Sequence, residues 1–328
     1  MMDEMKIAAI GECMIELSAG PNDGRADAGM TLRYGGDTLN TAVYLARLSR
    51  NGGPAVDYLT ALGDDPYSED MAAFWQREGL GTNLVARLPG HLPGLYTIRT
   101  DQAGERSFHY WRGASAARGM LAGAHGERLL AALTGYQLIY LSGITLSILT
   151  ADHRARLLDA LDRARAAGAR IAFDCNYRPR GWPDSQTARE AMDDMYRRCH
   201  IALPGLADEC ALNGKRYGEM DAATAARRIA DLGAGEVCLK DGGNGCLVAW
   251  DGKAESLAAE TAIKAVGVVD TTAAGDSFNA AYLHARLGGT GPADAARAGH
   301  RLAARVIQHP GAIIPLSAMP GAMPELEP

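Results

Sequence analysis

Short apolar segments alternate with longer segments of helical spacing along most of this chain. Lys6–Ile10 and Val56–Leu62 have the length and composition of buried strands, and Thr38–Ser49 and Tyr67–Glu78 repeat apolar residues every three or four positions. The second half continues with predicted strands at Leu138–Ser142, Arg170–Asp174, Ile201–Leu203 and Glu236–Lys240 and predicted helices at Ala151–Ala167, Ser185–Arg198 and Asp221–Leu232. Because strands joined through helices run parallel, we expect an α/β fold whose mostly parallel sheet has helices on both faces. Sheets of this kind bind ligands beyond the carboxyl ends of their strands.

Three strand-like segments interrupt this alternation early in the chain. Met30–Tyr34 lies between glycine-rich stretches, and the turn sequence Asp101–Gly104 separates Gly94–Thr100 from Glu105–Trp111, which predicts a hairpin. Strands inserted away from the helical alternation predict a small β-sheet lid over the edge of the main sheet. We therefore expect one domain over residues 1–328, with a lid formed by strand segments within about 12–34 and 94–112.

Composition narrows the classes of partner. The 328 residues include 33 Lys and Arg and 39 Asp and Glu, a net charge of −6, which disfavours nucleic acid or an anionic membrane as the main partner. No apolar run approaches the roughly 18 residues that span a bilayer, and the N-terminus has no signal-peptide pattern. The six cysteines form no C-x-x-C pair, which is typical of reduced, buried thiols. We predict a cytoplasmic protein that binds neither nucleic acid nor membrane.

The segment Val269–Asn279 carries the clearest chemical signal. After an apolar stretch, the small residues Ala273, Ala274 and Gly275 precede the acid Asp276 and a helical pattern. Small side chains at a helix start let backbone N–H groups approach an anion, and the helix dipole adds about half a positive charge there. Asp276 can then accept the proton of an attacking hydroxyl. Spacing alone leaves open the alternative that Asp276 only caps its helix.

This segment resembles the second signature of the ribokinase-like (PfkB) carbohydrate kinases, D-T-x-G-A-G-D, with Ala273 in place of the first glycine. Met5–Glu12 followed by Gly35–Ala42 resembles the family's opening strand and first signature. Within the family, the chain is most similar to the 2-keto-3-deoxygluconate kinases, in the stretches Gly11–Leu17, Leu92–Tyr96, Tyr110–Arg112, Asn176–Arg180 and Gln308–Pro315. The resemblance implies a three-layer α/β/α core of the ribokinase type with a β-sheet lid.

The activity that the resemblance implies is transfer of the γ-phosphate of ATP to the terminal 6-hydroxyl of this sugar acid, also named 2-dehydro-3-deoxy-D-gluconate. Asp276 matches the family's catalytic base, and Ala274, Gly275 and Asp276 match the residues whose backbone N–H groups form an anion hole around the phosphate. Ala273 belongs to the same catalytic segment. ATP and Mg²⁺ are the implied cofactors, with the metal held mostly by phosphates and water.

Eight positions match residues that face the substrate in relatives. They are Gly35, Gly36, Asp37 and Asn40 near the first signature, Tyr96 and Tyr110 on the lid strands, and Arg112 and Arg178. A guanidinium group binds a carboxylate through two parallel hydrogen bonds, so the arginines suit a sugar acid. Asp37 has an alternative role as the cap of the helix that begins near Thr38.

The nucleotide positions follow from the same resemblance. Lys240, Gly242 and Gly245 belong to the loop that lies along ATP, where relatives often have Arg or Lys in place of Asp241, and Asn279 matches a further cofactor position. Asp208 and Glu209 match an acidic pair near the phosphates, with Glu209 as the predicted Mg²⁺ contact. Asp270 and Thr272 match a monovalent-cation site that some relatives have for K⁺.

Other functions remain open at this stage. The nearest is a kinase of the same fold for fructose, ribose or a related keto-deoxy acid, and a different class is a sugar-binding protein without catalysis. A dinucleotide-binding dehydrogenase is disfavoured because residues 9–16 lack G-x-G-x-x-G after the first strand. The resemblance also implies a homo-oligomer, with a dimer through the lid as one form.

Overall fold

The computed structural model describes residues 5–19, 29–50, 52–100, 106–259 and 267–320. Its main sheet has ten strands in this part of the chain, and its spatial order is β14 (Lys253–Leu257), β13 (Cys246–Trp250), β12 (Glu236–Lys240), β11 (Ile201–Ala202), β10 (Arg170–Asp174), β9 (Leu138–Ser142), β1 (Lys6–Ile10), β4 (Ala55–Leu62) and β5 (Leu80–Gly81). The tenth strand, β6 (Val85–Arg87), also pairs with β4. Pairing is parallel from β12 to β5, and β13 and β14 add an antiparallel edge.

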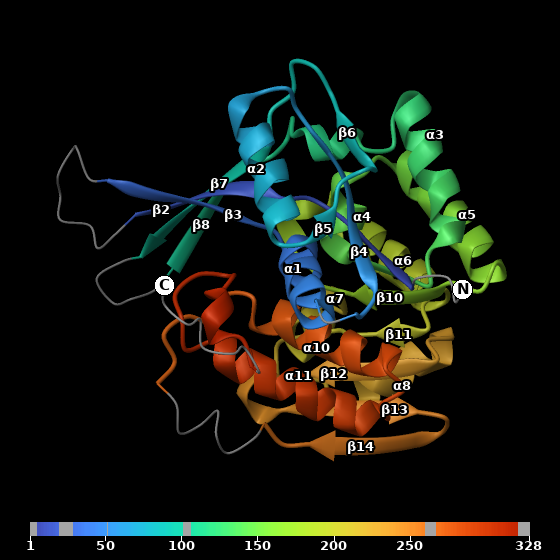
Figure 1. Cartoon of the computed structure of the whole chain (residues 1–328). Helices are drawn as coiled ribbons and strands as arrows, with labels where there is room; N and C mark the ends of the chain where they lie inside the picture. The colour runs from blue at the N-terminus through green and yellow to red at the C-terminus, as the bar shows by residue number, and fades with distance from the viewer. Residues whose placement is uncertain (1–4, 20–28, 51, 101–105, 260–266, 321–328) are drawn as a thin grey trace.

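Helices cover both faces of this sheet (Figure 1). One face packs against α1 (Asp37–Ser49), α2 (Pro66–Arg77), α10 (Ala274–Leu287) and α11 (Pro292–Val306). The other packs against α3 (Gly123–Ala132), α4 (Gly143–Ile148), α5 (Ala151–Ala166), α6 (Ser185–Tyr196), α7 (Leu206–Leu212) and α8 (Ala222–Leu232). Short 3₁₀ turns are η1 (Ala116–Gly119), η2 (Leu133–Gly135), η3 (Pro179–Gly181), η4 (Gly242–Asn244) and η5 (Leu316–Ala318).

Strand β1 shows why two cores form. Its residues Ile7 and Ala9 are buried in the core beneath α1 and α10, whereas Ala8 and Ile10 are buried in the opposite core. Successive side chains of a strand point to opposite faces, so a strand with four consecutive apolar residues needs cover on both sides. The predicted α/β fold with helices on both faces is confirmed.

A second sheet projects from one side of the core (Figure 1). Its four strands are β2 (Met14–Ala19), β3 (Met30–Gly35), β7 (Gly94–Thr100) and β8 (Arg106–Trp111), in the order β3-β2-β7-β8. Strands β7 and β8 pair antiparallel, as the predicted hairpin requires, and its turn lies outside the described residues. Strands β2 and β7 pair in parallel and join the two early segments into one lid.

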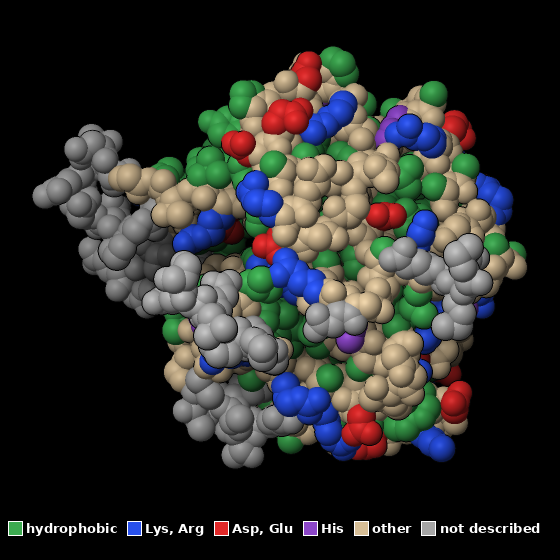
Figure 2. Space-filling view, viewed as in Figure 1, with side chains coloured by type: hydrophobic (Ala, Val, Ile, Leu, Met, Phe, Trp, Pro, Cys, Tyr) green, Lys and Arg blue, Asp and Glu red, His purple; other side chains and the backbone are tan. Residues whose placement is uncertain are grey.

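Two further features are the charge on the surface and the state of the cysteines. On the face shown in Figure 2, Lys and Arg side chains are interspersed with Asp and Glu and form no continuous basic stripe. The six cysteines are buried and unbridged. In the part of the chain that the structure describes, no helix is long and apolar enough to cross a membrane.

Candidate active site

A cleft of about 1510 Å³ lies between the lid and the carboxyl ends of the core strands. Lid residues Tyr96, Tyr110 and Arg112 line one part of it, and the residues that begin α10 line another. The loops after β10 and β12 complete the wall with Arg178 and Lys240 among others. The cleft is therefore at the place where a parallel sheet binds ligands.

Asp276 lies in the first turn of α10 and faces this cleft. Its carboxylate accepts a hydrogen bond of 2.8 Å from the side-chain amide of Asn40 on α1. Burial, followed by the nearby charge of Asp37, raises the pKa of Asp276 to about 8. Because the N-cap is Ala273 and Asp276 makes no capping hydrogen bond, the alternative of a simple helix cap is wrong.

The predicted anion hole is the start of α10. Ala273 has a left-handed backbone (φ 60°) and turns the chain into the helix. The N–H of Ala274 donates to the carbonyl of Thr271 at 3.2 Å. Gly275 and Asp276 follow in the first turn, where N–H groups have no acceptor within their own helix. The two N–H groups best placed for an anion are therefore those of Gly275 and Asp276.

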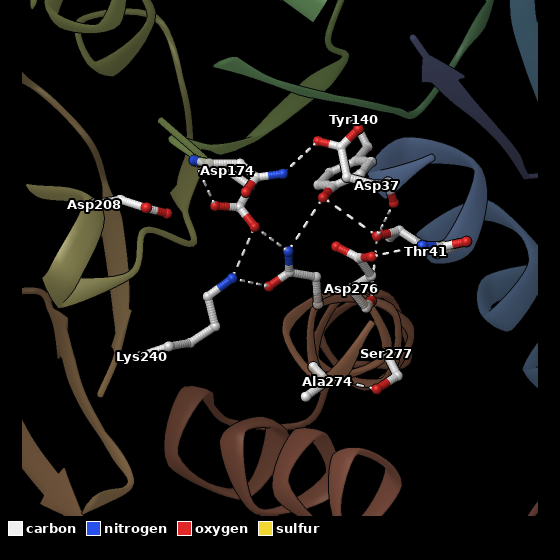
Figure 3. A network of polar contacts seen from close by, with 12 residues as sticks. Asp37, Thr41, Tyr140, Asp174, Asp208, Lys240, Ala274, Asp276 and Ser277 are labelled. Carbon is white, nitrogen blue, oxygen red and sulfur yellow. Dashed lines mark hydrogen bonds and ion pairs between the residues drawn. The ribbon is translucent and has the colours of Figure 1, made fainter. Parts of the chain in front are cut away.

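Lys240 extends from the end of β12 toward this helix start (Figure 3). Its ammonium donates to the carboxylate of Asp174 at 2.8 Å and to the side-chain oxygen of Asn279 at 2.9 Å. Asn279 is fully buried and does not line the cleft. The predicted direct contact of Asn279 with the cofactor is therefore wrong, because this side chain lies beneath Lys240.

Asp37 and Asn40 of α1 both line the cleft, as does Gly36 before them. The Asp37 carboxylate accepts a hydrogen bond of 2.7 Å from Asn176, whose left-handed backbone (φ 34°) lies in the loop after β10. The N-cap of α1 is Gly36 and has no side-chain cap, so Asp37 does not cap the helix. Sequence reasoning assigned no role to Asn176, although it follows the buried Asp174 at a strand end.

Gly35 is buried behind the cleft rather than on its wall. A Cβ at Gly35 would lie 2.7 Å from the hydroxyl of Tyr96, so the glycine makes room for that side chain. The Tyr96 hydroxyl donates to Glu16, and its ring lies 5.8 Å from the ring of Tyr110. The two tyrosines form an aromatic wall of the cleft. Gly35 supports this wall and, contrary to the prediction, does not reach the substrate space.

The two predicted arginines both reach the cleft, and both have acidic partners. Arg112 forms an ion pair with Glu12, which is fully buried. Arg178 forms an ion pair of 3.2 Å with Asp208. Burial opposes the charge on Arg178, but Asp208 and other nearby carboxylates raise the pKa of Arg178 overall. Burial also raises the pKa of Asp208, to about 6, although Arg178 opposes this.

The acidic pair at the start of α7 divides between two faces of the helix. Asp208 lines the cleft, whereas Glu209 is fully buried, accepts a hydrogen bond from Tyr196 and lies 3.6 Å from Arg228. Adjacent residues of a helix point about 100° apart, and here the cleft lies on the side of Asp208. The structure contradicts the predicted contact of Glu209 with the cofactor and Mg²⁺, and Asp208 is the member of the pair that faces the cleft.

The loop after β12 is only partly exposed to the cleft. Gly242 lines it, but Gly245 does not, because its backbone (φ 110°) packs so close to β14 that a Cβ would lie 2.0 Å from the carbonyl oxygen of Leu257. Gly245 is thus a structural glycine and its predicted contact with the cofactor is wrong. The Asp241 carboxylate accepts hydrogen bonds from Tyr217 and Asn244. These bonds stabilise the negative charge of Asp241 beside the predicted phosphate site.

Asp270 and Thr272 lie just before α10. One Asp270 oxygen accepts from the backbone N–H of Thr272 at 2.8 Å, and the other accepts from the backbone N–H of Gly311 at 2.8 Å. The carboxylate therefore holds two loops together beside the anion hole. A cation contact at these residues stays a prediction.

Comparisons with known proteins identify a family and similar enzymes. Residues 4–319 match the model of the pfkB family carbohydrate kinases. The chain is similar to the 2-dehydro-3-deoxygluconokinase of Dickeya dadantii, with 46% identity over 97% of this chain and 100% of the relative. It is similar to the enzyme of the same name from Escherichia coli, with 43% identity over 96% of this chain and 99% of that one.

A solved structure shares the fold. It is a putative ribokinase II from Escherichia coli in complex with ATP and Mg²⁺, with a TM-score of 0.78 and 19% identity over 94% of each chain. At this identity the likeness concerns the fold.

Proposed function

Since the chain belongs to the pfkB family of carbohydrate kinases, we propose that it transfers the γ-phosphate of ATP to the terminal hydroxyl of 2-dehydro-3-deoxygluconate. The product is the 6-phosphate of this sugar acid. The family resemblance found in the two sequence signatures is confirmed by the match over residues 4–319. The substrate rests on full-length similarity to relatives of that name and on the arginines in the cleft.

The single observation that carries the proposal is the position of Asp276. Its carboxylate has a pKa raised to about 8, and it lies one residue after Gly275 in the first turn of a helix that opens into the cleft. A base and unpaired N–H groups at one point serve two needs of phosphoryl transfer. The base takes a proton from the attacking hydroxyl, and the N–H groups stabilise charge on the transferring phosphate.

The reaction then follows from the arrangement of these groups. The terminal oxygen of the sugar forms a bond to the γ-phosphorus as its proton passes to Asp276, and the bond between the γ-phosphorus and the β–γ bridging oxygen breaks. The lid wall of Tyr96 and Tyr110 covers the sugar and limits the entry of water. The exclusion of water would favour transfer to the sugar over hydrolysis of ATP.

The sugar acid differs from neutral sugars by its carboxylate. We assign its recognition to Arg112 and Arg178, which reach the cleft from the lid and from the loop after β10. Arg112 uses one Nη for Glu12, and Arg178 uses one Nη for Asp208 and the carbonyl of Tyr177, so the other Nη of each arginine is available to the ligand. Loss of such a charge-assisted contact costs about 1.5–3 kcal/mol, or roughly ten- to a hundredfold in affinity.

The residues near Lys240, where we place the nucleotide, suit a divalent metal ion. Asp208 is the half-buried carboxylate that faces the cleft near Lys240, and carboxylate oxygens suit Mg²⁺. Asp208 would hold the ion together with the phosphates, and the ion would neutralise phosphate charge during transfer. Asp270 and Thr272 stay our candidates for a K⁺ contact.

A substrate panel tests the proposal. ADP release is measured with 2-dehydro-3-deoxygluconate, fructose and ribose, with wild-type protein and Asp276→Asn. We expect the highest kcat/KM for the sugar acid and a loss of about 10²–10⁴-fold in Asp276→Asn. A higher kcat/KM for fructose or ribose would contradict the substrate, and sugar binding without ADP release would identify a binding protein.

A further inference from the structure

The ammonium of Lys240 is held at a fixed point beside the start of α10. Two of its three N–H groups are used, at 2.8 Å to Asp174 and 2.9 Å to Asn279. A Cβ at Gly275 would lie 3.6 Å from the Lys240 nitrogen, so only a glycine separates the ammonium from the predicted anion hole. The third N–H group has the cleft beside it, because Lys240 and Gly275 both line that space.

The residues that hold Lys240 are themselves fixed by buried contacts. The side-chain amide of Asn279 donates to Asp174 at 2.6 Å and to the hydroxyl of Tyr140 at 3.1 Å. That hydroxyl lies 3.3 Å from the hydroxyl of Thr41 on α1. Asn279, Tyr140 and Thr41 are fully buried and Asp174 is almost so. Figure 3 shows this network between Lys240 and Asp276. A lysine held in this way loses little conformational entropy when a ligand binds.

The burial of Lys240 also suits an anionic ligand next to its ammonium. The ammonium is paired with Asp174, and the Lys240 side chain is only 14% exposed, so water screens the charge weakly. A phosphoryl group that carries increasing charge would meet a cation already in position, with no reorganisation at the moment of transfer. A lysine that only closed a buried ion pair would not need to face the cleft.

We propose, on the basis of the proposed function, that Lys240 is a catalytic residue that donates its third N–H to the phosphoryl group during transfer from ATP to the sugar. Asp174 and Asn279 are positioning residues that fix the ammonium. Lys240 keeps its protons throughout, since the proton of the sugar hydroxyl goes to Asp276 and the electron pair of the broken bond stays on ADP. The contact is strongest in the transition state, so it acts on kcat more than on KM.

The first test compares Lys240→Met with Lys253→Met, a matched change at an exposed lysine on β14. We expect Lys240→Met to lower kcat by about 10²–10³-fold with less than about a threefold change in the KM of the sugar, and Lys253→Met to change neither. A Lys240→Met variant that keeps kcat and only raises the KM of ATP would overturn the proposal, since Lys240 would then bind the nucleotide in its ground state.

A pH profile separates this role from a structural one. The titratable and charged groups that interact with Asp276 include Asp37 and Tyr44 on α1, Tyr140 on β9, Asp174 at the end of β10, Arg178 after β10 and Lys240 at the end of β12. Lys240→Met removes a positive charge that favours ionisation of Asp276 beside two other carboxylates. The pKa of Asp276, and with it the midpoint of the kcat/KM profile, should therefore rise. An unchanged midpoint would contradict the placement of the ammonium beside the reacting groups.

The positioning role is tested by a double-mutant cycle. Asn279→Ala should lower kcat by about tenfold in the wild-type background and have no further effect in Lys240→Met, because it acts through the lysine. Equal losses in both backgrounds would overturn that role. Thermal unfolding of each variant shows whether the fold is retained.

These outcomes are distinct from failure of the proposed function. The variants are compared on whichever sugar the wild-type protein phosphorylates, so a wrong sugar acid would leave the test of Lys240 intact. Absence of phosphoryl transfer to any sugar by the wild-type protein would overturn both proposals.

Discussion

The carboxylate of Glu12 forms an ion pair with the guanidinium of Arg112 and thereby connects the loop after β1 to the end of the lid strand β8. Glu12 is fully buried, and its other oxygen has no hydrogen-bond partner among the described residues, as is also the case for Nε of Arg112. The ion pair therefore joins the core to the lid. It also fixes the orientation of Arg112, which faces the cleft.

Glu12→Gln should raise the KM of the sugar acid by about tenfold, because Arg112 loses the charge that orients it toward the ligand. The KM of ATP should change little, since Lys240 and Asp208 lie elsewhere in the cleft. Steady-state kinetics measure both constants. The matched control is Glu127→Gln, which removes an exposed ion pair with Arg156 and should change neither KM. A lower KM for the sugar acid in Glu12→Gln would mean that Glu12 competes with substrate for Arg112.

The raised pKa of Asp276 gives the activity a predictable pH dependence. A general base acts when deprotonated, so kcat/KM should rise with pH up to about 8 and then level off. Asp37→Asn removes a negative charge that disfavours ionisation of Asp276, and the midpoint should therefore move to lower pH. The readout is the midpoint of the profile, because Asp37 is also a candidate for sugar binding. A midpoint that stays in place would show that Asp37 does not act on Asp276 through charge.

Ala273 occupies a left-handed conformation that costs an L-residue about 1–2 kcal/mol. Ala273→Gly should remove most of this strain and raise the free energy of unfolding by about 0.5–1 kcal/mol after the greater backbone entropy of glycine is subtracted. Denaturant unfolding measures the change. Ala280→Gly, in the interior of α10, should instead be destabilising by about 1 kcal/mol. Destabilisation by both changes would contradict strain at Ala273.

The two acids of α7 should respond differently when Mg²⁺ is varied. Asp208→Asn should raise the Mg²⁺ concentration needed for half-maximal activity several-fold, because its carboxylate faces the cleft. Glu209→Gln should leave this concentration unchanged and lower the melting temperature, since Glu209 is buried against Tyr196 and Arg228. Titration of Mg²⁺ at saturating ATP and sugar separates the two. The reverse pattern would restore the assignment made from the sequence.

The sequence predicted the strands of the main sheet where the local apolar pattern is strong. Segments such as Lys6–Ile10 and Glu236–Lys240 are short with an apolar centre, and the structure has strands with these bounds. The antiparallel edge of β13 and β14 and the parallel pairing of β2 with β7 were not predicted, because partners distant in the chain determine them. Local patterns do not specify which strand a lid segment will join.

The sequence predicted which segments lie at the cleft better than it predicted which way each side chain points. Asp276 and Lys240 lie in the cleft, as the signatures indicated. Glu209 and Asn279 face away from it, because the side on which a helical residue lies depends on where the helix begins and on how it packs. Glu12 carried no sequence signal for a contact with Arg112, since the two residues are 100 positions apart.

The lid is a sheet whose strands pair only with one another among the described residues. Asp276 and Asn279, by contrast, lie three residues apart on α10, a core helix packed against α1 and α11. The lid residues that we assign to the sugar and the groups that we assign to phosphoryl transfer therefore lie in different parts of the fold, which the ion pair of Glu12 with Arg112 connects. Substitutions in β7 and β8 can alter which sugar is accepted while the geometry of proton removal is preserved, so redesign for a new acceptor should begin on those two strands.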